Sequence, residues 1–320
     1  MTDQATLIRA EGVDEEPPAG YERRLKPGPL LWAFTAAAIF YAGWHLYVLN
    51  ISPVETIMFR ILHIAGTLAL GFIIAMPVQG KEQGMFPDLP MALAWVADMV
   101  AAGLVGYAVV VLGIAWAGGE APEPTLLQYF GPSLAGGTAL AILSAWFLPA
   151  TPGLVPLRDW VLTVSALTVC AFLLFGLQYT GLRMRAGTSF VDPQNGWTAM
   201  VGVALILELT RRVAGLALVI IACVFVAYAF AGPYLPGILE HRGYPAWRFF
   251  SYLYTGNGIL GPTTAVSSTY IILFIIFAAF LQASKVGDYF VNFSFAAAGH
   301  ARGGPAKVAV FASGLMGMIN

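Results

Sequence analysis

The stretch MALAWVADMVAAGLVGYAVVVLGIAWA, residues 91–117, decides the fold class of this chain. Its only charged side chain is Asp98, and it contains no proline. A bilayer core about 30 Å thick is crossed by roughly 20 mostly apolar residues in a helix. The run exceeds that length, so it predicts a transmembrane helix with room to tilt or shift.

The rest of the chain has the same character. Of its 320 residues, 58% are hydrophobic and 10% are charged, and the mean hydropathy is +0.75. Soluble domains carry about 25% charged residues. We therefore predict an all-α membrane protein with about eight transmembrane helices. The predicted spans are residues 30–49, 61–78, 91–117, 134–150, 160–177, 196–209, 213–231 and 262–281.

The number of crossings depends on the sixth segment, residues 196–209, which is short for a span and has Glu208 near its end. A re-entrant segment, which enters the membrane and leaves on the same side, is the alternative for residues 196–209. Lys and Arg concentrate in the cytoplasmic loops of membrane proteins. Eight crossings with a cytoplasmic N-terminus place most Lys and Arg inside, whereas losing the sixth crossing makes the two sides nearly even. With eight crossings, the outer side holds only Arg183, Arg185, Arg242 and Arg248, besides Arg60 near a membrane edge.

Three segments lie outside the predicted spans. Residues 1–29 are polar, acidic and rich in proline, which predicts a disordered cytoplasmic tail. Residues 245–260 carry several aromatic side chains beside Arg248, which is typical of the outer bilayer surface. Residues 286–299 place apolar side chains at helical spacing. They predict an interfacial arm helix that lies flat on the inner face.

Several other classes of protein lack support in the sequence. The formal net charge of -1 gives no basic patch for nucleic acid. Cys170 and Cys223 lie in apolar runs, where a thiol mostly serves as a small packing residue. The four histidines are scattered without partners at metal-ligand spacing, and no nucleotide-binding motif is present. We predict neither a resident cofactor nor an enzyme.

Ionisable residues at membrane depth cost about 2.5–3.5 kcal/mol on insertion scales, so each marks a candidate site. Arg60 and His63 share a helix face at the outer end of the second span, where an interface anchor is favoured over a transport role. Glu208 precedes Arg211 and Arg212 by one helical turn. This spacing favours a local ion pair over contact with a substrate.

The chain ends with GHARGGPAKVAVFASGLMGMIN, residues 299–320. Gly303 and Gly304 predict a turn, and Pro305 fits the first position of a helix. Residues 305–320 rise about 24 Å as a helix, which is less than a bilayer core. The segment therefore predicts a helix that enters from the cytoplasmic side and ends inside the membrane. An ordinary span that continues past residue 320 is the alternative.

These residues resemble the opening of the large membrane subunit of tripartite ATP-independent periplasmic (TRAP) transporters. The resemblance covers about residues 160–320 and is nearest to the type in which the small and large membrane subunits are fused. The pieces that carry it are ILELTRRVAGLALVIIACVFVAYAFAGPYLPGILEHRG (206–243), FLQASKVGDYF (280–290), GHARGGPAKVAV (299–310) and ASGLMGMIN (312–320).

The resemblance implies a sodium-driven permease of a bacterial inner membrane. A soluble extracytoplasmic solute-binding protein of the TAXI group would deliver the substrate, usually an organic acid. The arm helix would connect the scaffold to the moving domain, and the segment after Gly304 would form the first limb of a re-entrant hairpin. Ser313, Gly317 and Asn320 carry over as candidate ion or substrate ligands. The negative C-terminal end of that helix suits a sodium ion.

The same resemblance implies a domain organisation. Residues 30–195 would form a small-subunit-like region with two extra spans at about 91–150, and residues 196–320 would begin the large-subunit-like transport region. Because the chain stops where the hairpin tip would start, we expect an N-terminal fragment. Two alternatives stay open: a membrane scaffold or accessory subunit complete at 320 residues, and a membrane enzyme that uses Asp98 or Glu208.

Overall fold

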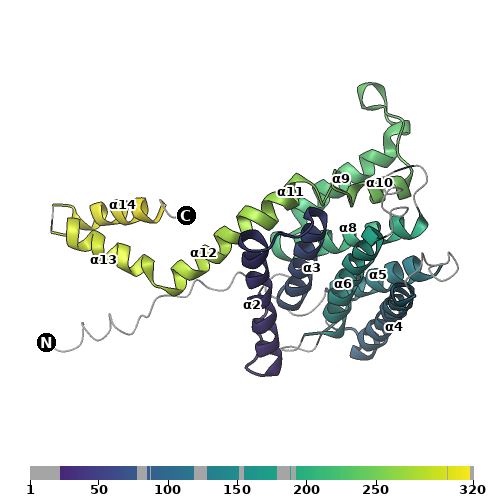
Figure 1. Cartoon of the computed structure of the whole chain (residues 1–320), viewed down its shortest axis with the longest axis horizontal. Helices are drawn as coiled ribbons and strands as arrows, with labels where there is room; N and C mark the ends of the chain where they lie inside the picture. Colours follow the sequence, from purple (N-terminus) through teal and green to yellow (C-terminus); the bar gives the residue numbers. More distant parts are fainter. Residues whose placement is uncertain are drawn as a thin grey trace. The chain divides into compact units, whose positions relative to one another are not determined.

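The computed structural model describes residues 22–77, 85–86, 88–118, 128–150, 155–178, 188, 192–300 and 302–317. Within these residues the regular elements are helices, apart from one isolated bridge between Glu22 and Ala75 (Figure 1). The predicted all-α membrane fold is confirmed. The long helices are α2 (Pro29–Asn50), α3 (Thr56–Ile74), α4 (Met91–Ala117), α5 (Phe130–Phe147), α6 (Leu157–Gln178), α8 (Pro193–Ala214) and α9 (Leu216–Ala231).

Shorter helical elements follow α9. They are η1 (Gly232–Tyr234), η2 (Gly237–Leu239), α10 (Ala246–Leu253), α11 (Pro262–Val266), the π-helical η3 (Ser267–Ile271), α12 (Ile272–Ala283), α13 (Val286–Ala298) and α14 (Gly304–Gly317). Among the described residues, seven helical segments are long and apolar enough to cross a membrane, and Pro262–Ala283 is one of them. Each of the eight predicted spans coincides with a helix, but α8 falls outside the seven.

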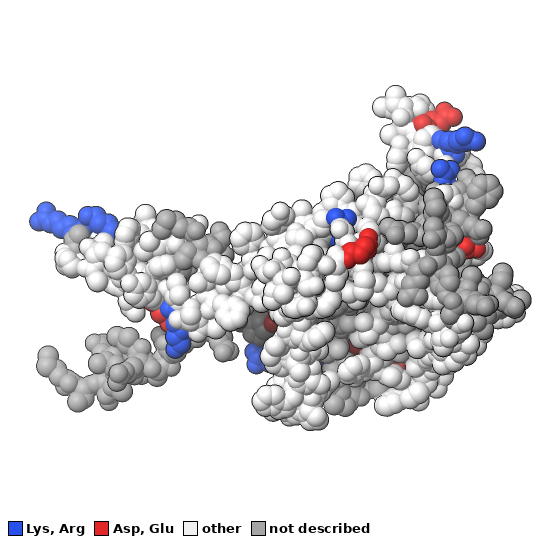
Figure 2. Space-filling view, in the orientation of Figure 1, with Lys and Arg blue, Asp and Glu red and all other residues white. Residues whose placement is uncertain are grey.

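The chain divides into two compact units. The described residues of Met1–Ala38 and Glu55–Thr264 form unit 1, and those of Ile39–Val54 and Ala265–Asn320 form unit 2. Uncharged residues make up most of the described surface visible in Figure 2. Such a surface fits a protein whose helices face lipid, because lipid favours apolar side chains on the outside.

The core of unit 1 lies between helices α3, α4, α5, α6 and α8. The side chains of Phe72, Leu134, Leu162 and Leu205 are fully buried there, and they come from four different helices. Helices α4 and α5 pack on each other and on α6, and α5 also packs on α8. The two predicted extra spans are therefore part of the central packing of this unit.

Helix α8 runs beside α5 over the length of both helices. Near their starts, the backbone N–H of Gly131 donates to Gln194 Oε1 at 3.0 Å. Near their ends, Trp146 Nε1 donates to Glu208 Oε2 at 2.7 Å. Helix α5 is itself a candidate span. Because α8 extends as far as α5 in the same direction, this pairing supports a full crossing by the sixth segment.

Helix α8 ends at Gly215, whose φ of 85° reverses the chain into α9. On the opposite end of unit 1, α10 packs on α8, and the rings of Trp197 and Trp247 lie 4.6 Å apart. The ring of the buried Tyr254 lies against Gly202 of α8, where an added Cβ would be 2.6 Å from Tyr254 Cζ. Aromatic side chains thus attach the predicted outer segment to α8.

Unit 2 contains the strongly apolar helix α12, the predicted arm helix α13 and the last helix α14. Phe274 and Phe280 of α12 are largely exposed, as expected for a helix that is apolar on all sides and faces lipid. Lys285 has a φ of 57°, a left-handed conformation that separates α12 from α13. The predicted helix over residues 286–299 is confirmed as α13.

Candidate functional site

The predicted junction between arm and hairpin is a tight turn. Gly303 has a φ of 73°, which a side-chain-bearing residue rarely adopts. A Cβ on Gly304 would collide with the carbonyl oxygen of Gly299, so the two glycines let the chain fold back closely. Pro305 follows as the second residue of α14. The turn and the helix start that the sequence predicted are both present.

Helix α14 folds back on α13. The rings of Phe293 and Phe311 lie 6.2 Å apart, and Val308 and Ala312 are buried in unit 2. This arrangement differs from the expected one, in which α13 lies flat on the membrane and α14 turns away from it into the bilayer. Both helices carry apolar side chains, and each covers part of the other's apolar face. The course of α14 through a bilayer stays a prediction.

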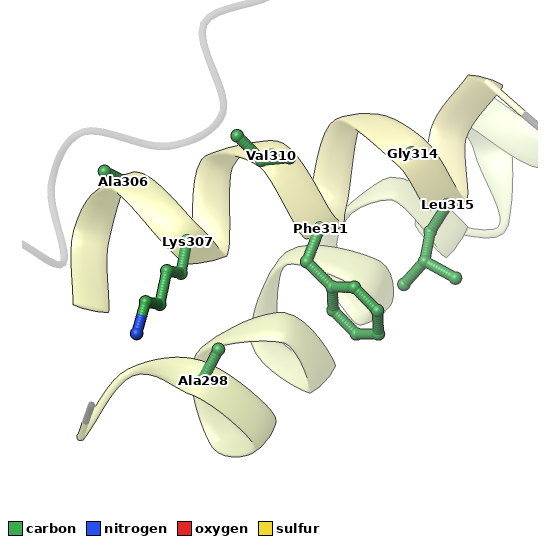
Figure 3. Close-up of a pocket in the computed structure, with 7 residues that line it drawn as sticks. All are labelled: Ala298, Ala306, Lys307, Val310, Phe311, Gly314 and Leu315. Atoms are coloured by element: carbon green, nitrogen blue, oxygen red, sulfur yellow. The ribbon is translucent and has the colours of Figure 1, made fainter. Parts of the chain in front are cut away.

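A hollow of about 700 Å³ lies beside the α13–α14 pair. Figure 3 shows Phe311 and Lys307 directed from α14 toward α13, whereas Val310 and Ala306 point away from it. Lys307 is the one charged residue among those that line the hollow. The rest of the hollow's surface is mainly apolar. The lining residues are Ala298, Ala306, Lys307, Val310, Phe311, Gly314 and Leu315.

Two of the three predicted ligands, Ser313 and Gly317, fall within the described residues. Ser313 and Gly317 are exposed residues of α14, and neither lines the hollow. Asn320 lies outside the described residues. The Ser313 hydroxyl and the last carbonyls of α14 provide oxygen atoms that could coordinate a cation near the negative end of the helix. That chemistry fits a cation, but the described residues supply only part of a coordination shell.

Glu208 forms the local ion pair that its spacing predicted. Its carboxylate accepts from Arg211 Nε at 2.8 Å and from Arg212 Nε at 2.7 Å. It also accepts from Trp146 Nε1, and it is 3% exposed. Glu208 is thus shielded from water, although it lies near the end of the sixth predicted span. Neutralisation by two guanidinium groups takes the place of hydration.

The pair continues into a larger buried group that sequence reasoning missed. Asp159 of α6 accepts from Arg212 Nη1 at 2.8 Å and from Arg23 Nη2 at 2.6 Å. Arg212 Nη1 also donates to the carbonyl of Ala75, where α3 ends. The ends of α3 and α8 thus meet the start of α6. We call Arg23, Asp159, Glu208, Arg211 and Arg212 the ionic cluster.

Arg23 corrects the prediction of a disordered tail for part of its length. Residues 1–21 lie outside the described residues, but Arg23 N donates to the carbonyl of Ile74 at 2.7 Å. Its guanidinium is buried and also donates to the carbonyl of Ile73. The pairing with Asp159 holds this segment in unit 1. A charge in a polar tail gives no local signal of such a distant partner.

Asp98 lies close to the cluster but has different partners. Its carboxylate accepts from the Ser144 hydroxyl of α5 at 2.5 Å, and it is buried. Arg158 donates to the carbonyls of Ser144, Leu148 and Pro149 and so binds the end of α5. Asp98 therefore does not shift to the surface. It is buried in unit 1 and hydrogen-bonded to a hydroxyl of a neighbouring helix.

Arg60 makes a contact within unit 1, and its role as an interface anchor stays a prediction. Its Nη1 donates to the carbonyl of Leu260 at 2.8 Å, which connects α3 to the segment after α10. His63, one turn later, is buried. In the part of the chain that the structure describes, no group of three or more His, Cys, Asp or Glu residues is placed to hold a metal ion.

The fold and these contacts define a multi-pass helical membrane protein. Residues 201–320, from within α8 to the last residue, match the family model of the tripartite ATP-independent periplasmic transporter, DctM component. This match covers the C-terminal part of the chain, which is thus similar to a membrane component of TRAP transporters. No curated protein and no solved structure matched the chain.

Proposed function

We propose that this chain is the membrane permease component of a sodium-driven secondary transporter that receives organic acids from an extracytoplasmic solute-binding protein. The observation that carries the proposal is the family match over residues 201–320, the region that includes α9 to α14. The family generally works with a solute-binding protein in a bilayer. We infer that this partner is of the TAXI type and that the membrane is a bacterial inner membrane.

Unit 1 has the properties of a scaffold in this proposal. Its helix ends are connected by the ionic cluster, and α5 pairs with α8 at both ends. We infer a fused permease, in which residues 30–195 correspond to the small subunit and residues 196–320 begin the large one. The packing of α5 on α8 then joins the two parts directly.

The ion chemistry of the proposal concerns α14. A helix that ends at membrane depth directs its last carbonyl oxygens, the negative end of its dipole, toward a bound cation. Ser313 and Gly317 are exposed there, and Asn320 follows in the sequence. We propose that these residues contribute oxygen ligands to the sodium or substrate site, while the binding protein determines most of the substrate specificity.

The topology of the proposal has the N-terminus in the cytoplasm. The ionic cluster supports the alternating course of the helices, because it joins the ends of α3 and α8 to the start of α6 and so places them on one side of the membrane. The alternating topology with eight crossings predicts that these ends all lie on the cytoplasmic side. The α5–α8 pairing favours this count over a re-entrant sixth segment.

The test is uptake by the full-length gene product in proteoliposomes. A panel of mono- and dicarboxylates is first screened for a thermal shift of the cognate binding protein, and the acid with the largest shift becomes the labelled substrate. Uptake should require an inward sodium gradient and the binding protein together. Equal uptake after replacing sodium with potassium, or after omitting the binding protein, would contradict the proposal.

A further inference from the structure

The segment between α9 and α10, residues 232–245, forms a hairpin that extends beyond the ends of both helices (Figure 1). We call it the outer loop. It contains the short helices η1 and η2, and charged side chains of both signs lie on it in Figure 2. The predicted topology places it on the extracytoplasmic side.

His241 holds the outer loop in one conformation. Its Nδ1 accepts from the backbone N–H of Gly243 at 3.1 Å, and its Nε2 lies 3.1 Å from the carbonyl oxygen of Tyr228 in α9. The imidazole lies so close to Gly232 that a Cβ there would collide with it. The Tyr228 hydroxyl also donates to the carbonyl of Leu239 at 3.3 Å. The loop is therefore attached to the end of α9.

This braced loop presents apolar side chains to its surroundings. Ile238 is 100% exposed and Tyr234 is 88% exposed, while Leu239 is exposed by half. The candidate span that contains α9 ends at Tyr234. Its 16 helical residues rise about 24 Å and the three residues of η1 add about 6 Å, which together match a bilayer core. Ile238, four residues after the end of this span, therefore lies beyond the hydrocarbon core.

We propose that the outer loop is a docking surface for the extracytoplasmic solute-binding protein, with Ile238 as its apolar anchor. This inference rests on the proposed function. Exposed Glu240 and Arg242 flank the apolar side chains, and an apolar centre with a charged rim is the usual anatomy of a protein interface. The competing occupant is the lipid headgroup layer, and the brominated-lipid measurement below distinguishes it from the binding protein. Because the loop is braced, little ordering is needed on binding.

The proposal is tested by measuring the affinity of the binding protein, loaded with its carboxylate, for the full-length chain in nanodiscs. Ile238→Asp places a charge at the centre of the surface without removing a packed side chain. We expect it to weaken binding about tenfold or more, as for loss of an interface anchor. The matched control is Ile51→Asp, at a 72% exposed isoleucine between α2 and α3, which should stay within about twofold.

Equal affinity for Ile238→Asp and the unmodified chain, or an equal loss in Ile51→Asp, would overturn the proposal. If the unmodified chain binds and takes up substrate while Ile238→Asp does the same, the docking surface is wrong and the transport function stands. If the unmodified chain neither binds nor transports, the proposed function itself fails.

A second measurement locates the loop with an Ile238→Cys variant. The native cysteines lie within candidate spans, so a membrane-impermeant maleimide reports the introduced thiol. Labelling of intact spheroplasts, and its suppression by excess binding protein, would support docking. Labelling from the cytoplasmic side alone, quenching of an attached fluorophore by brominated lipids, or crosslinking to a second copy of the chain would overturn it.

Discussion

The ionic cluster of unit 1 and the α13–α14 pair of unit 2 differ in the burial of the polar residues compared here. In the cluster, Asp159 and Arg212 are fully buried and each has charged partners from distant parts of the sequence. In the α13–α14 pair, Ser313 and Lys307 are exposed. The difference indicates that charge in unit 1 holds helices together, whereas the Ser313 hydroxyl and the Lys307 ammonium group of unit 2 are accessible at the surface. Two changes test this contrast, and a third tests the aromatic packing on α8.

The largest expected effect is on stability, from Asp159→Asn. The substitution leaves the guanidinium groups of Arg23 and Arg212 without their shared carboxylate in a buried site. Loss of one partner from a buried ion pair costs about 3–5 kcal/mol. The free energy of unfolding in mixed micelles should fall by about that amount. The control is Asp88→Asn at an exposed position, for which a comparable loss would contradict a specific role of the cluster.

A smaller effect is expected where α8 meets the outer aromatic segment. In Gly202→Ala the new methyl group would lie 2.6 Å from Tyr254 Cζ, and overpacking of this kind costs about 1–3 kcal/mol. Gly103 of α4 has no atom within 4 Å of such a methyl group. Gly103→Ala should therefore be neutral or stabilise the helix by about 0.5–1 kcal/mol. Equal unfolding free energies for the two variants would show that the Tyr254 ring does not pack against Gly202.

The helices could be predicted from the sequence because hydropathy is a local property. Residues 91–117 formed a long apolar run with Asp98 as its single charge, and α4 has these bounds. Residues 196–209 gave too short a span because Glu208, Arg211 and Arg212 interrupt the apolar pattern, yet α8 continues to Ala214. Charged residues lower the mean hydropathy of a segment whether or not the fold neutralises their charge. Here the partner that allows burial, Asp159, comes from another helix.

The ionic cluster could be predicted only in part, for the same reason. The pairing of Glu208 with Arg211 and Arg212 follows from helical spacing, which is visible in the sequence. The contact between Arg23 and Asp159 joins residues 136 positions apart, and no periodicity reports it. One usable signal was the pair Arg158 and Asp159 at the start of an otherwise apolar helix, because two charges there need partners or water.

The smallest effect on stability is expected in α14, where the proposed function predicts a change in activity instead. Ser313→Ala removes an exposed hydroxyl, so the free energy of unfolding should change by less than about 0.5 kcal/mol. If that hydroxyl is a sodium ligand, its loss is worth about 1–1.5 kcal/mol. The sodium concentration for half-maximal uptake should then rise about tenfold.

Ser284→Ala is the matched control for this change, because it removes an exposed hydroxyl that donates to the carbonyl of Leu281 in the same unit. It should leave the sodium dependence of uptake unchanged. The same sodium dependence in both variants would remove Ser313 from the site. A stability loss above about 1 kcal/mol in Ser313→Ala alone would show instead that its hydroxyl is packed. In that case α14 would resemble the ionic cluster, and the contrast between the two regions would no longer hold.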